Sequence, residues 1–163
     1  MNKISGIFVL MSVIAATCFQ PAISPALTGE QEKAIETAVL NADAEIVQAA
    51  ERLDAEAMFS NILDSGKCVI IQNGKLMSRQ EALASTQASF AELQQLEYNI
   101  ETPQITILSP ESALLVSHGQ STATTKSGQT FTTDFAVTDI YILKDNGWKL
   151  VHGHHSIPIR RSN

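Results

Sequence analysis

Apolar residues recur at spacings of three and four along the first part of the chain. They form one stripe, which predicts a helix from about Thr28 to Arg52 along Ile35, Val39, Ala42, Ile46, Ala49 and Leu53. Asp54 can cap a short second helix that Gly66 ends. Ser78 and Glu81 have the spacing of a capping box, which predicts a third helix over Leu83, Gln87, Phe90 and Leu93.

The second half of the chain has the pattern of strands. From Leu96 onward threonine and β-branched residues dominate, and turn signals return at intervals. We expect strands over residues 98–108, 113–125, 129–143 and 148–156, and a short one over 68–71 ending in an Asn73-Gly74 hairpin turn. Pro103 requires an edge position or a bulge. Helices followed by an antiparallel meander predict an α+β fold with one domain over residues 27–163.

Residues 1–26 read as a cleaved signal peptide. Lys3 precedes an apolar run that is short for a bilayer span, and Ser24-Pro25-Ala26 offers small residues for cleavage. We therefore expect a secreted or periplasmic protein that has no membrane association after cleavage. Lipidation at Cys18 is a minor alternative, because Thr17 is a poor residue before a lipoprotein cleavage site.

Charge and motifs exclude several classes of protein. The 163-residue chain has a formal charge of −6, so it lacks the basic surface that a nucleic-acid partner requires. It has no G-x-S-x-G nucleophile elbow, no G-x-G-x-x-G and no phosphate loop, and we expect no cofactor. Acidic residues dominate residues 30–64, and we interpret this run, Asp43 included, as a solvated helix face.

All four histidines lie in the predicted sheet. Side chains alternate between the two faces of a strand. With even-numbered loops at Asn146-Gly147 and Ser127-Gly128, one face carries Asp139, Tyr141, Trp148, His118, His152, His154 and Ser156. His155 then points to the other face. A one-residue bulge in any of these strands would reverse the assignment.

This predicted face suggests a site. A carboxylate beside an imidazole favours its charged form and fixes its tautomer, so the pair can act as a general acid or base. His154, His152 and Asp139 are the candidate catalytic residues, and Tyr141, His118, Trp148 and Ser156 are the candidate ligand-binding residues. Two other interpretations stay open: a polar cluster in an oligomer contact, and an open metal site built from His118, His152 and His154.

The C-terminal run from Thr138 to Ser156 resembles the end of a nuclear transport factor 2-like domain. It has an aspartate–glycine turn (Asp145-Asn146-Gly147), then Trp148-Lys149, and then His152-x-His154-x-Ser156. More closely, it resembles the SnoaL-like branch and the association domain of calcium/calmodulin-dependent protein kinase. The order of helices and strands upstream agrees, so the resemblance extends from about Glu30 to Ser156.

The resemblance implies a cone of curved antiparallel sheet wrapped around the N-terminal helices, also described as a cystatin-like roll. It implies a pocket at the open end and a homodimer built sheet to sheet. The kinase association domain typically carries an arginine where Asp139 stands, so anion binding does not carry over. We expect an exported protein that binds a small molecule in this pocket, with isomerase- or dehydratase-like acid/base catalysis as its possible chemistry. The alternatives are a non-enzymatic dimerisation module and a metal-dependent hydrolase with three histidines.

Overall fold

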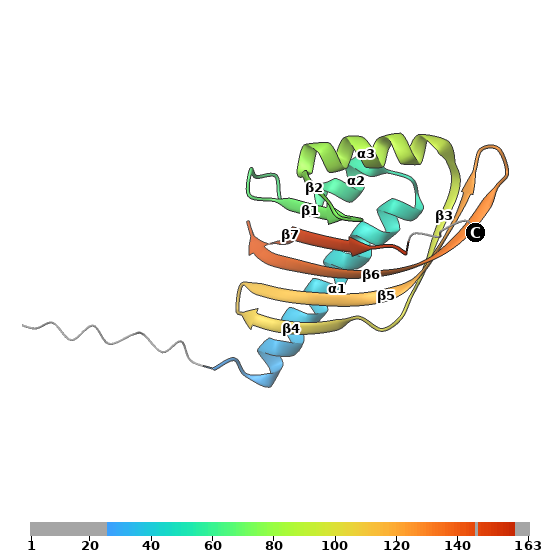
Figure 1. Ribbon diagram of the computed structural model, residues 1–163. Helices are drawn as coiled ribbons and strands as arrows, with labels where there is room; N and C mark the ends of the chain where they lie inside the picture. Colours follow the sequence, from blue (N-terminus) through green and yellow to red (C-terminus); the bar gives the residue numbers. More distant parts are fainter. Residues whose placement is uncertain (1–25, 146, 159–163) are drawn as a thin grey trace, which may run out of the picture.

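The computed structural model describes residues 26–145 and 147–158. The expected signal peptide and Cys18 lie outside these residues. Three helices and seven strands follow one another as α1 (Gly29–Glu51), α2 (Ala55–Ser60), β1 (Val69–Gln72), β2 (Lys75–Ser78), α3 (Arg79–Glu92), β3 (Leu93–Ile100), β4 (Gln104–Ser109), β5 (Ser112–Thr125), β6 (Thr130–Lys144) and β7 (Gly147–Ser156). Figure 1 shows α1 lying diagonally across one face of a curved sheet, with α2 and α3 on the same side.

The helices begin at the predicted positions, and the first also has a capping box that the sequence analysis did not identify. The Thr28 hydroxyl accepts from the Gln31 amide, and the Gln31 side chain accepts from the Thr28 amide, which closes a capping box at the start of α1. Asp54 caps α2, and Ser78 forms the expected box with Glu81 at the start of α3. Within the described ranges, no helix is long and apolar enough to cross a membrane.

The strands form one open, curved sheet in the order β2-β1-β7-β6-β5-β3, and β4 also pairs with β5. Most neighbours are antiparallel, but β1 runs parallel to β7, so the sheet is mixed. The strand expected over residues 98–108 is in fact two strands. The strand is interrupted at residues 101–103, because Pro103 has no N–H to donate to a neighbouring strand. As a result, β3 and β4 pair with different halves of β5.

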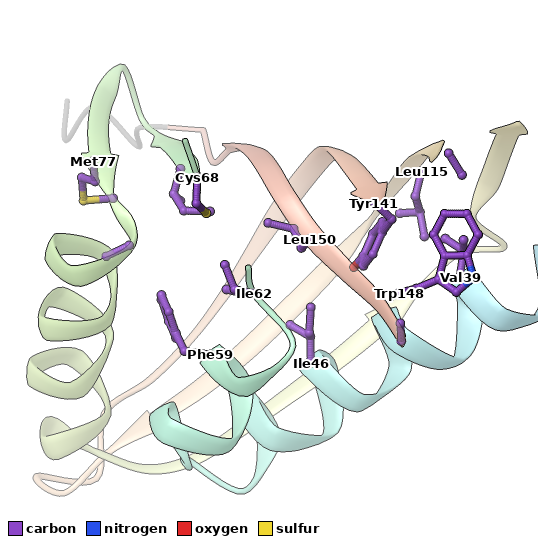
Figure 2. Close-up of a cluster of buried hydrophobic side chains, with 14 residues drawn as sticks. Val39, Ile46, Phe59, Ile62, Cys68, Met77, Leu115, Tyr141, Trp148 and Leu150 are labelled. Carbon is purple, nitrogen blue, oxygen red and sulfur yellow. The ribbon is translucent and has the colours of Figure 1, made fainter. Parts of the chain in front are cut away.

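The core fills the space between α1 and the inner face of the sheet. Figure 2 shows Val39, Leu115 and Trp148 at one end, Cys68 and Met77 at the other, and Tyr141 between the sheet and the helix. Tyr141, Leu115 and Val39 are fully buried. Ile46, Phe59, Met77 and Leu150 belong to this core and also line a cavity beneath the concave face.

Two local irregularities decide which side chains reach the inner face. Tyr141 pairs with Leu150, as expected if odd-numbered residues of β6 share a face with even-numbered residues of β7. The register then shifts by one residue, so Ile140 pairs with His152. Val151 is thus an extra residue, which reverses the faces of the rest of β7. The β5–β6 loop is odd-numbered, because Thr125 bonds to Gln129 across residues 126–128 and His118 pairs with Ala136. The predicted face is therefore wrong for His118, His152, His154 and Ser156.

Candidate functional site

A cavity of about 230 Å³ lies between the helices and the inner face of the sheet. Most of its wall is apolar, with side chains such as Ile46, Phe59, Leu150, Phe135 and Val137. Among the described residues, the acid and base groups in its wall are the carboxyl groups of Asp43 and Asp139, the imidazole of His155 and the hydroxyl of Tyr98. An apolar hollow with a few convergent polar groups is the usual form of a small-molecule site.

Asp43 enters the cavity from α1. It lies on the buried stripe of the helix, between Val39 four residues before it and Ile46 three residues after it. The fully buried Tyr141 hydroxyl donates a 2.8 Å hydrogen bond to Asp43 Oδ1. Burial is the main reason that the pKa of Asp43 rises from 3.8 to about 6; the negative charge of Asp139 adds to the rise, and the Tyr141 hydrogen bond opposes it.

Asp139 enters from β6 and is only 4% exposed. Its Oδ1 has no hydrogen-bond donor among the described residues, and it lies 3.7 Å from Nε2 of His155. Asp139 pairs with Gly153 on β7, and His155 comes two residues later on the same face. A Cβ at Gly153 would lie 3.1 Å from Asp139 Oδ1 and 3.5 Å from His155 Nε2. The absence of a side chain at Gly153 thus makes room for the carboxylate and the imidazole.

The structure brings together only part of the predicted site. Asp139 and Tyr141 face inward as expected, and the buried Trp148 packs in the core. His118 faces outward, where its Nε2 lies 3.5 Å from a Glu101 carboxylate oxygen. His152 and His154 also lie on the outer face, and Ser156 is exposed opposite Ala136. The inward positions belong to Ser117 and His155 instead.

A three-histidine metal site does not form. His118 lies on β5, two strands away from His152 and His154 on β7. Over residues 26–145 and 147–158, no three histidine, cysteine or acidic side chains gather in an arrangement that would hold a metal ion. The interpretation as a three-histidine hydrolase is therefore wrong.

Sequence reasoning missed Asp43 and His155 for different reasons. Asp43 had a visible signal, because an acid three residues before Ile46 and four after Val39 interrupts an apolar stripe rather than extending a solvated face. His155 had none, since its face depends on the bulge at Val151.

A second hollow, more open and about 420 Å³ in volume, lies between the α1–α2 turn and the end of α3. Its polar side chains are already engaged, since Gln87 donates to Glu56 at 2.8 Å. The hollow contains neither His155 nor either cavity aspartate. It therefore offers no comparable cluster of acid and base groups.

Comparison with solved structures finds the same fold. A candidate dehydratase of the NTF2-like family from Streptomyces avermitilis superimposes with a TM-score of 0.70 and 18% identity, covering 79% of this chain and 99% of that one. A candidate scytalone dehydratase from Novosphingobium aromaticivorans gives a TM-score of 0.74 and 9% identity, covering 81% and 89%. A hexachlorocyclohexane dehydrochlorinase gives 0.69 and 10%, covering 81% and 90%.

No curated protein matches the sequence. The sequence profile of the SnoaL-like domain matches residues 39–160, which include Asp43, Asp139 and His155. This match spans most of the chain and agrees with the observed sheet and helices. The chain shares the fold of solved NTF2-like proteins, and it belongs to the SnoaL-like domain family.

Proposed function

We propose that this protein is an enzyme that uses general acid/base catalysis on a small molecule bound in the cavity. The reaction would be a dehydration, an isomerisation or a related elimination. The observation that carries the proposal is the convergence of Asp43, Asp139 and His155 on one mostly apolar hollow. Solved structures of this fold include proteins described as dehydratases and a dehydrochlorinase, which supports elimination chemistry. With the expected signal peptide, we propose that the enzyme acts after export.

His155 is the proposed base. Its Nε2 lies 3.7 Å from Asp139 Oδ1, close enough for the carboxylate to stabilise the imidazolium that forms when the ring takes up a proton. The Asp139 side chain is 5% exposed and that of His155 31%, so water screens this interaction only in part. A positioned base of this kind contributes about 10²–10⁴-fold to a proton transfer.

Asp43 is the proposed acid. A carboxyl group whose pKa is raised to about 6 keeps its proton in about a tenth of molecules at pH 7, far more often than an ordinary aspartate does. Tyr141 fixes the position of this carboxyl through its 2.8 Å hydrogen bond. Asp43 can then protonate a leaving hydroxyl or a carbonyl oxygen while His155 removes a proton from the same ligand.

The proposal is tested with 5-nitrobenzisoxazole, a compact aromatic probe. A base removes its ring proton, the N–O bond breaks, and a coloured cyanophenolate is released. We expect saturable ring opening by the wild-type protein. His155→Ala and Asp139→Asn should each lower kcat/KM by tenfold or more, because both remove part of the base.

His154→Ala is the matched control. It removes the neighbouring histidine, which lies exposed on the outer face. This variant should keep the wild-type rate, and circular dichroism should show that all three variants are folded. Wild-type rates in folded His155→Ala and Asp139→Asn proteins would overturn the proposal.

The outer face of the sheet supports a second proposal, that two copies pair through it. Leu114, Val116, Ile140 and Ile142 alternate with buried residues and lie on this face, and Val116 is 39% exposed. An apolar strip on an uncovered sheet face marks an interaction surface. We expect a dimer by light scattering, and a monomer for Val116→Lys. A monomeric wild-type protein would refute the pairing.

A further inference from the structure

The ionisable groups around the cavity are mainly acidic. Among the residues that the structure describes, the wall contains two aspartates and one histidine, but no lysine or arginine. Even with His155 protonated, one negative charge has no positive partner when both carboxyl groups are ionised. An anionic ligand would lie against these carboxylates without a cation to compensate it, which is costly in an apolar hollow.

The most buried of these groups, Asp139, has a carboxylate oxygen that receives no hydrogen bond from the described residues. Asp139 is 4% exposed and lines the cavity, and this oxygen is its Oδ1. A buried acceptor without a donor is destabilising, and more so when it is charged. A ligand that brings an N–H or O–H donor to this oxygen would remove that penalty.

Aromatic rings line the same cavity. Tyr98 and Phe135 lie edge to face, with ring centroids 5.6 Å apart and an angle of 85° between the planes. Phe59 and Phe90 also contribute to the wall. Aromatic faces attract cations through the ring quadrupole, and aromatic rings combined with carboxylates are the usual receptor for an organic ammonium group.

We infer that the cavity binds a compact organic amine in its protonated form, with the ammonium group directed to the Asp139 and Asp43 carboxylates and the apolar body against the aromatic wall. The volume limits the size of this body. A cavity of about 150 Å³ accommodates benzene, so about 230 Å³ holds one substituted ring. This inference rests on the proposed site, but it does not require that the site be catalytic.

Three probes of similar size and different charge test which ligand charge the cavity prefers: benzylamine, benzyl alcohol and benzoate. Binding is measured by calorimetry at neutral pH in phosphate buffer, because amine buffers would compete. We expect benzylammonium to bind at least tenfold more tightly than benzyl alcohol, and benzoate to show no binding. Equal or tighter binding of benzyl alcohol, or any binding of benzoate in the cavity, would overturn the inference.

Two variants show whether Asp139 makes the distinction. Asp139→Asn should weaken benzylammonium binding at least tenfold and leave the affinity for benzyl alcohol nearly unchanged. The matched control is Asp134→Asn, which changes an exposed aspartate on the same strand that accepts a hydrogen bond from Gln120. This control should bind all three probes as the wild type does. An Asp139→Asn protein with wild-type preference for benzylammonium would contradict the assignment.

The two proposals can fail separately. Benzylammonium binding by a protein without ring-opening activity would support the ligand class and refute the enzyme. Ring opening that depends on His155, together with a preference for benzyl alcohol, would support the enzyme and refute the ammonium site.

Discussion

Asp43 should make the folded protein less stable at neutral pH than a neutral residue would. Its pKa is about 6 in the folded protein, against 3.8 for an ordinary aspartate, and the main cause is burial. The folded state therefore holds the proton more tightly than the unfolded chain. Its contribution to stability is fully present below about pH 4 and is lost as the pH rises to about 6.

The size of this effect follows from the difference in pKa. A pKa difference of about 2 units corresponds to about 3 kcal/mol of lost stability at pH 8, and to about 0.5 kcal/mol at pH 4. Asn in place of Asp43 has no charge to bury, and its carbonyl can still accept from Tyr141. Burying the amide of Asn also costs free energy, which reduces the stabilisation that follows from removing the charge. We therefore expect Asp43→Asn to raise the free energy of unfolding by about 1–3 kcal/mol at pH 8, with little change at pH 4.

Urea unfolding at the two pH values measures this difference. Glu36→Gln is the matched control, because Glu36 is exposed on the same helix, and its effect should stay within about 0.5 kcal/mol. Destabilisation by Asp43→Asn at pH 8, or an equal change at both pH values, would refute the argument that Asp43 is buried at an energetic cost.

Two further predictions concern the surroundings of the two cavity carboxyl groups, first Asp139 and then Asp43. Gly153→Ala should lower the free energy of unfolding by about 1–3 kcal/mol, because its Cβ would lie 3.1 Å from Asp139 Oδ1. Gly147→Ala is the control and should leave the free energy of unfolding in urea nearly unchanged, since the nearest atoms to its Cβ would lie at 3.9 Å. Equal losses of stability in the two variants would contradict the reasoning. Tyr141→Phe removes a hydrogen bond that favours the charged carboxylate, so the pKa of Asp43 should rise above about 6 in a carbon-13 NMR titration. An unchanged or lower pKa would show that this bond is unimportant.

Helix starts and the Asn73-Gly74 turn were predictable because each depends on a few neighbouring residues. Thr28, Asp54 and Ser78 cap the three helices as their side chains require. Asn73 and Gly74 both have positive φ, as a two-residue hairpin turn requires. The fold class also followed from the order of helices and strands and from the resemblance at the C-terminus.

The faces of the long strands were not predictable from local sequence. Side-chain alternation is reliable only over an unbroken strand, and one extra residue at Val151 exchanges His154 for His155 on the inner face. The β5–β6 loop exchanges His118 for Ser117 in the same way. Both shifts depend on pairing with other strands, so neither the sequence pattern nor the family resemblance contains them. The parallel pairing of β1 with β7 depends on tertiary contacts in the same way.

Three separate departures from locally favourable structure meet at the cavity. α1 carries an acid on its buried stripe, β7 contains an extra residue at Val151, and Gly153 leaves a gap opposite Asp139. Each is unfavourable by itself, since a buried carboxyl is desolvated, a bulge interrupts the ladder, and glycine is poorly suited to a strand interior. A sequence under selection for stability alone would have no reason to gather all three within reach of one carboxylate. Departures of this kind are expected to gather where a sequence is selected for a binding or catalytic site, and this supports the proposed roles of Asp43, Asp139 and His155.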